Sequence, residues 1–157
     1  MKRVIIYSVL FLSLLNNSVM SEEFDVPAAL LKDVENKTMR PFFNALKNGN
    51  VKIIKQYISG EMYEESRILL EENKDYPEFL REHYKGAIFS VKRGVSSDNQ
   101  LIVDVAVEFP GMGEQISRYI LEEPGAESVG RRQDVEEMHW RITKQRNNLE
   151  RSIESGE

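Results

Sequence analysis

The sequence contains no cysteine among its 157 residues. Disulfide bonds, thiol catalysis and a lipidated cysteine are therefore excluded, and a hydrophobic core has to stabilise the fold. Histidine is also scarce, since only His83 and His139 occur, far apart in the chain. Zinc sites are built mainly from clustered Cys and His side chains, so the sequence predicts no metal site. Motifs of phosphate loops, nucleophile elbows and calcium loops are missing too, and we expect no cofactor.

Basic side chains are in the minority, with 21 Lys and Arg against 26 Asp and Glu and a net charge of −5. The paired arginines of "GRRQ", residues 130–133, lie in a stretch flanked by glutamates. Nucleic acids and anionic membranes are bound by positively charged surfaces. The composition therefore argues against both of them as the main partner.

A long apolar run is missing as well. The N-terminal run from Val4 to Leu15 is shorter than the roughly 20 apolar residues of a membrane-spanning helix. It follows two basic residues and precedes a polar stretch that ends at Ser21 with small side chains, which is the pattern of a secretory signal peptide. We expect residues 1–21 to be removed and the mature protein to be exported, periplasmic or secreted, without a membrane span. An uncleaved membrane anchor is the alternative.

The hydrophobic period of the remaining chain changes along its length. Residues 22–38 carry mixed signals and predict a short helix or a partly ordered lead-in. Apolar residues then recur every three or four positions over 39–58, interrupted near Gly49, and again in two segments over 59–84. This spacing predicts helices.

After Gly86 the period becomes two. In "NQLIVDVAVEF" one face carries only apolar residues, which are Leu101, Val103, Val105, Val107 and Phe109. The segments "AIFSVKR", "EQISRYILEE" and "MHWRITKQ" predict three further strands. Helices followed by about four mainly antiparallel strands indicate an α+β fold. We interpret residues 124–137, between the last two strands, as a tolerated insertion rather than a functional loop, and residues 146–157 as a polar tail.

Over residues 39–145 the chain resembles the nuclear transport factor 2-like superfamily, which includes exported bacterial members. The resemblance rests on "FFNALKNGNVKIIKQYISGEMY", on "YPEFLREHYKGAIFSV" and on the closing strand "HWRITK". It implies a cystatin-like cone in which N-terminal helices pack on a curved sheet, often leaving a pocket. Members of the superfamily are either small-molecule enzymes or non-catalytic binding and assembly modules, so the fold alone does not decide the function.

An enzyme with this fold needs an acid or base whose pKa is tuned by burial in an apolar pocket. Asp104 and Glu108 lie on the same face of one predicted strand. If this face lines the pocket, Asp104 is the best candidate base. We favour the alternative of an exposed face on which the carboxylates pair across strands with Arg118 or Lys92.

The two histidines are weaker candidates. His83 ends a predicted helix, where a cationic side chain suits the helix dipole, and we expect a capping or surface role. His139 and Trp140 are neighbours on a predicted strand and therefore point to opposite faces. We favour the arrangement in which Trp140 faces the core and His139 points away from it.

The helical segments are rich in aromatic residues. Tyr57, Tyr63 and Tyr84 are candidates for lining an apolar ligand cavity, because such cavities favour aromatic walls with few polar groups. The plainer interpretation places these side chains in the core and at its rim.

The leading hypothesis is an exported, non-catalytic binding or assembly module that holds a small apolar ligand or a protein partner. We expect it to form a homodimer through the open face of its sheet. It rests on the lack of an acid–base pair clearly placed inside the expected concavity. The alternative is an isomerase- or dehydratase-like enzyme that uses Asp104 as base and a tyrosine as hydrogen-bond donor. A secreted effector or stress protein acting on a host or envelope partner is not separable from the first hypothesis by sequence.

Overall fold

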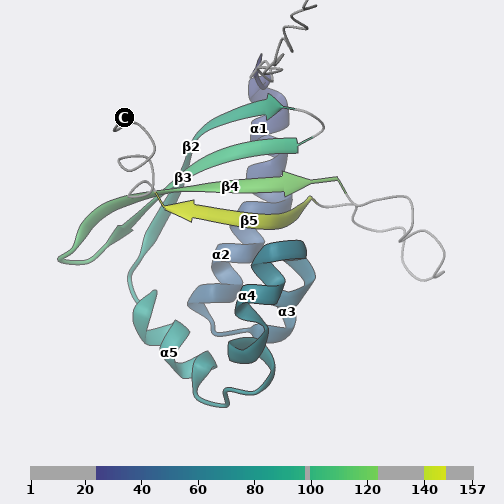
Figure 1. Ribbon diagram of the computed structural model, residues 1–157. Helices are drawn as coiled ribbons and strands as arrows, with labels where there is room; N and C mark the ends of the chain where they lie inside the picture. Colours follow the sequence, from purple (N-terminus) through teal and green to yellow (C-terminus); the bar gives the residue numbers. More distant parts are fainter. Residues whose placement is uncertain (1–23, 98–99, 124–139, 148–157) are drawn as a thin grey trace, which may run out of the picture.

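The computed structural model describes residues 24–97, 100–123 and 140–147. Apart from one short strand, the helices come first and the strands follow, and the helices lie on one side of the sheet (Figure 1). The predicted α+β fold, with helices packed on a curved antiparallel sheet, is confirmed. The elements in chain order are β1 Phe24–Asp25, α1 Ala28–Val34, the π-helix η1 Glu35–Met39, α2 Arg40–Lys47, α3 Val51–Tyr57, α4 Gly60–Glu71, α5 Tyr76–His83, β2 Ile88–Ser97, β3 Gln100–Phe109, β4 Gly113–Glu122 and β5 Arg141–Asn147.

Gly49 separates α2 from α3, and the predicted break at this residue is confirmed. Its φ of 60° lies in the left-handed region, and a Cβ added there would lie 2.1 Å from the carbonyl oxygen of Pro77. Only glycine avoids both problems. Asn50 then starts α3, because its side-chain oxygen accepts a hydrogen bond from the backbone N–H of Ile53 at 3.2 Å.

The sheet is an antiparallel meander with the strand order β1-β2-β3-β4-β5. Within the described residues it contains five strands where the sequence predicted about four. The additional strand is β1, which is only two residues long and pairs with the end of β2. Two register irregularities interrupt the ladders, one at Lys92 on β2 and one on β5 opposite Ile120 and Leu121. Such bulges bend a strand and increase its twist, which is consistent with a curved sheet.

The two faces of β3 differ as the sequence predicted. Leu101, Val103, Val105, Val107 and Phe109 are all buried and belong to the core between sheet and helices. This alternation fixes the register, because a shift by one residue would turn the whole set away from the helices.

Aromatic rings fill the helix side of the sheet. Phe43 of α2 stacks on Phe89 of β2 at 4.8 Å between ring centroids, and it meets Tyr119 of β4 edge-on at 5.9 Å. Phe42 lies edge-on to both Phe43 and Tyr119, at 5.5 and 6.3 Å. Phe42, Phe43 and Tyr119 are each at most 3% exposed. The side of the sheet that would form the concavity is therefore occupied by packed side chains around these rings.

The last strand begins slightly later than predicted. The pattern "MHWRITKQ" starts at residue 138, whereas β5 runs over Arg141–Asn147. Trp140, just before it, packs against the core, as predicted. His139 lies outside the described residues, as do the expected signal segment 1–21, the insertion 124–137 and most of the tail 146–157.

Candidate functional site

The side of the sheet that faces away from the helices is the main candidate surface. We call it the open face. On β3 it consists of Gln100, Ile102, Asp104, Ala106 and Glu108. The residues opposite these on β2 and β4 also belong to it, and so do the residues of β5 that lie opposite those of β4. Directly opposite residues of an antiparallel pair point to the same side, so these side chains form rows across the strands. In the described part of the chain the helices lie mainly on the other side of the sheet (Figure 1). The N-terminus of α4 reaches the β5 border of this face, where Glu61 pairs with Lys144, and Val95 and Ala106 within the face are buried.

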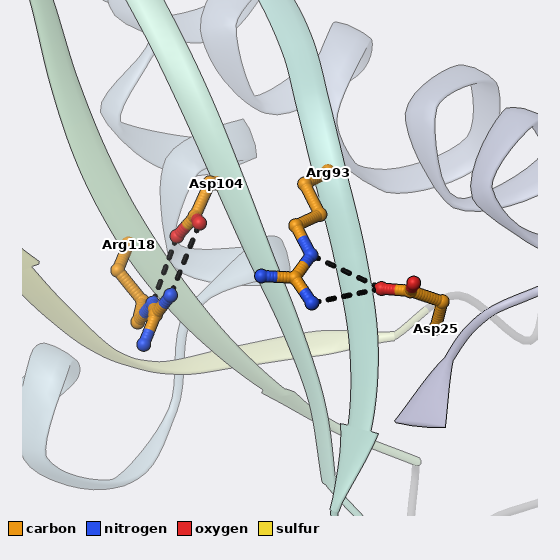
Figure 2. Close-up of polar contacts among 4 residues, drawn as sticks. All are labelled: Asp25, Arg93, Asp104 and Arg118. Atoms are coloured by element: carbon orange, nitrogen blue, oxygen red, sulfur yellow. Dashed lines mark hydrogen bonds and ion pairs between the residues drawn. The ribbon is translucent and has the colours of Figure 1, made fainter. Parts of the chain in front are cut away.

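One of these rows consists of charged side chains. The row runs across four neighbouring strands. Its members are, in order, Arg93 of β2, Asp104 of β3, Arg118 of β4 and Arg146 of β5, and each lies opposite the next. Arg118 donates to Asp104 from Nε at 2.8 Å and from Nη2 at 3.1 Å, while Arg93 donates to Asp25 of β1 at 3.0 and 2.9 Å. Figure 2 shows the two ion pairs side by side, with Arg93 between the carboxylates of Asp104 and Asp25. Signs therefore alternate from β1 to β4.

Asp104 is placed on the open face rather than among the core aromatics. Its bidentate pairing with Arg118 agrees with the favoured interpretation of cross-strand charge pairs, and both side chains are 21% exposed. A carboxylate held by two charge-assisted hydrogen bonds is stabilised as an anion that accepts hydrogen bonds, which suits a structural role. Its use as a catalytic base stays a prediction from the sequence, and this placement does not favour it.

The open face also carries an apolar row and exposed isoleucines. Val95 lies opposite Ile102, and Ile102 lies opposite Ile120. Closer to the β3–β4 turn, Ile88 is 65% exposed and Ile116 is 36% exposed. The face is thus a mixture of apolar and charged side chains, as found in protein–protein interfaces.

Charges without an ion-pair partner lie at two separate places on this face. Glu108 lies at the β3–β4 turn end, while Arg141 and Arg146 lie on β5. None of the three has an ion-pair partner within residues 24–97, 100–123 and 140–147. Their neighbours are already paired, with Lys92 at 3.1 Å from Glu114 and Lys144 at 2.6 Å from Glu61 of α4.

The three candidate tyrosines lie on different helices or helix ends. Tyr57 of α3 is buried in the core. Tyr63 of α4 is half-buried and donates a hydrogen bond to Glu71, and this bond raises the pKa of the Tyr63 phenol. Tyr84, just after α5, packs against Phe109 at 5.7 Å, and burial raises the pKa of Tyr84 to about 12. None of the three lines either of the two pockets described below, so their role in ligand binding stays a prediction.

His83 lies at the end of α5 and is exposed, as predicted. It stacks on Phe79 at 5.5 Å with an interplanar angle of 13°, and it lies 5.1 Å from the ring of Phe109. These contacts make His83 part of an aromatic cluster that fixes α5 to the end of β3.

Two surface pockets were not predicted. The α1–β2 pocket has a volume of about 360 Å³ and is lined by the apolar Ala28, Leu31 and Val91 and by the charged Lys32, Glu35 and Arg40, among others. A second pocket of about 250 Å³ lies at the N-terminus of α4 and beside Ile120 and Lys144 of the open face. Each pocket is lined by residues from segments that are far apart in the sequence, so no local sequence pattern could have predicted either pocket.

Within the described ranges, no group of three or more His, Asp or Glu side chains is arranged to hold a metal ion. None of the helices that the structure describes is long and apolar enough to cross a membrane.

Comparison of the chain with protein-family models, with curated proteins and with solved structures found no match.

Proposed function

We propose that the protein is an exported, non-catalytic binding or assembly module with a nuclear transport factor 2-like fold that forms a homodimer through its open face. The observation that carries the proposal is the composition of this face, where isoleucines lie among ordered ion pairs. Interfaces of soluble proteins combine an apolar centre with a polar rim and aligned charges in this way. A protein partner is thus favoured over a small apolar ligand.

The packed helix side of the sheet supports the same choice. A small-molecule pocket of this fold would lie between the sheet and the helices. Phe42, Phe43 and Tyr119 occupy that region with at most 3% exposure. Ligand sites need a cleft of several hundred Å³ with a few convergent polar groups. The ring packing around α2 therefore favours a role for the outer surface of the sheet.

The distribution of charge supports a second copy of the chain as the occupant. Glu108 and the arginines of β5 lie at different places on the same face and have no ion-pair partners among the described residues. Most homodimers have two-fold symmetry, so each patch meets a patch of the partner. A two-fold axis that passes between Glu108 and β5 brings Glu108 of one protomer over the arginines on β5 of the other. The face is therefore complementary to itself in charge.

Sedimentation of the protein and of two matched variants tests the proposal. We expect a monomer–dimer equilibrium in which Ile116→Glu raises the dissociation constant at least about 30-fold, the size expected when a charge replaces an apolar interface residue. Ile68→Glu is the control, because Ile68 is exposed on α4, away from the open face. A protein that stays monomeric at all concentrations, or a dimer that responds equally to both substitutions, would contradict the proposal.

A further inference from the structure

The outer edge of β2 is only partly covered by β1. Phe24 and Asp25 pair with Ser96 and Val95, and the N–H of Val26 donates to the carbonyl oxygen of Gly94 at 3.1 Å. Pro27 then has no N–H to donate, and the chain turns into α1. From Ile88 to Arg93 no other strand in the described part of the chain pairs with this edge.

The α1–β2 pocket opens beside this free edge. Leu31 of α1 and Val91 of β2 are half-buried residues packed against the core, and they supply the apolar part of its lining. A Cβ at Gly94 would lie 2.7 Å from Cδ1 of Leu31. The absence of a side chain at Gly94 thus lets α1 approach the strand closely and fixes the position of Leu31.

The charged side chains of the pocket differ in whether they have an ion-pair partner. Arg40 donates to Glu35 at 2.7 Å, and its guanidinium lies 5.8 Å from the ring centroid of Phe89. Both charges of that pair are therefore engaged. Lys32 has no ion-pair partner among the residues that the structure describes. The pocket offers one available positive charge beside an apolar wall.

We propose that the free edge of β2 binds an extended segment of another protein by strand addition. The segment carries an apolar side chain that enters the α1–β2 pocket and a nearby carboxylate that pairs with Lys32. Backbone hydrogen bonds along the edge supply affinity in this mode of recognition, and pockets for alternate side chains supply specificity. Because Lys92 forms a bulge, regular pairing is confined to Ile88–Val91.

Charge argues for an acidic segment of another protein rather than the β2 edge of a second copy. Antiparallel pairing of two β2 edges would bring the bulge at Lys92 of each copy into the shared ladder. Bulges and lysines on edge strands oppose such self-pairing. A carboxylate of an acidic partner segment meets the opposite charge of Lys32, the pocket's available cation.

Binding of a short capped peptide to the full chain tests the proposal. The probe alternates Val with Thr and contains one central Glu, and its binding is followed by the backbone amide signals of the protein. We expect saturable shifts at Ile88–Arg93. A peptide of the same sequence with its alternate backbone nitrogens methylated should bind at least about tenfold more weakly, because it cannot pair as a strand. Shifts confined to the open face, or no saturation up to about 1 mM probe, would overturn the proposal.

Variants of the pocket complete the experiment. Lys32→Glu should weaken peptide binding at least about tenfold, and Ala28→Phe, which fills the pocket, should do the same. Lys52→Glu makes the same charge change at an exposed position of α3 and should leave binding within about twofold. Equal effects of Lys32→Glu and Lys52→Glu would show that only net charge matters and would overturn the proposed site. Self-association should not respond to Lys32→Glu, so this result is independent of the homodimer.

Discussion

Arg118 of β4 donates two hydrogen bonds to Asp104 of β3, from Nε to Oδ1 at 2.8 Å and from Nη2 to Oδ2 at 3.1 Å. Both side chains are 21% exposed, whereas Arg93 and Asp25 in the neighbouring pair are 56% and 76% exposed. Partial burial reduces the screening of a charge pair by water, and bidentate geometry strengthens it. The two pairs look alike in Figure 2 but should differ in their contribution to stability.

The first prediction compares these two ion pairs. Asp104→Asn should lower the free energy of unfolding by about 1–3 kcal/mol, because it leaves a partly buried guanidinium without its carboxylate. Asp25→Asn should lower the free energy of unfolding by about 0–1 kcal/mol, the usual contribution of an exposed ion pair. Urea denaturation of both variants measures the difference. Equal losses in the two variants would contradict this view of the charged row.

The second prediction concerns Gly49. Replacing it with Ala should lower the free energy of unfolding by about 2–5 kcal/mol, because the new Cβ meets Pro77 and the backbone is held at positive φ. Gly111→Ala is the matched control, since Gly111 has φ 79° and nothing within 4 Å of an added Cβ. The Gly111→Ala variant should lose only about 1–2 kcal/mol of unfolding free energy, which is the backbone strain of a positive φ. Thermal unfolding distinguishes the two, and similar losses would show that the contact with Pro77 is unimportant.

The third prediction is a dependence of stability on alkaline pH. Burial raises the pKa of Tyr84 from 10 in the unfolded chain to about 12 in the fold. The contribution of this tyrosine is fully present below pH 10 and is lost as the pH rises toward 12, because the unfolded state releases the proton first. Tyr84→Phe should therefore make the decline in stability between these pH values less steep. An unchanged slope in the variant would show that Tyr84 does not titrate in this way.

The fourth prediction concerns export. When the full sequence is expressed in a bacterial host, the protein should leave the cytoplasm and begin at Glu22, because the small residue Ser21 fits the position before cleavage. Mass spectrometry of the cell fractions measures the N-terminus directly. Recovery of an uncleaved chain in the membrane fraction would favour the membrane anchor instead.

Strong local patterns of residues predicted the main parts of the fold. The alternation from Leu101 to Phe109 defined the central strand and its buried face, and Gly49 marked the break between α2 and α3. A cross-strand pair of the β3 carboxylates with Arg118 or Lys92 was also expected, because two strands joined by a short turn place such residues opposite each other. The structure pairs Asp104 with Arg118.

Other features depend on contacts between distant segments. β1 contains two residues, which is too few to show a hydrophobic period, and only its pairing with Ser96 and Val95 defines it. The α1–β2 pocket brings Leu31 next to Val91 across 60 positions of sequence, and the approach depends on Gly94. Sequence spacing predicts neighbours within one helix or one hairpin, but it does not predict which helix lies beside which strand edge.

The same limit applies to the tyrosines. Their helical spacing predicted membership of a cluster, yet Tyr57 is buried in the core while Tyr63 bonds to Glu71 near the surface. A periodic pattern marks the face of a helix that is apolar but not the depth at which each residue lies.

The most direct test of the central claim is a charge exchange across the open face, followed by sedimentation equilibrium. If the open face forms a two-fold dimer in which Glu108 lies over β5 of the partner, Glu108→Arg should weaken the dimer, as should Arg141→Glu combined with Arg146→Glu. Combining all three substitutions should restore association toward that of the unchanged protein, since the opposite charges meet again. Additive weakening in the combined variant, or no change in any of them, would contradict dimerisation through this face.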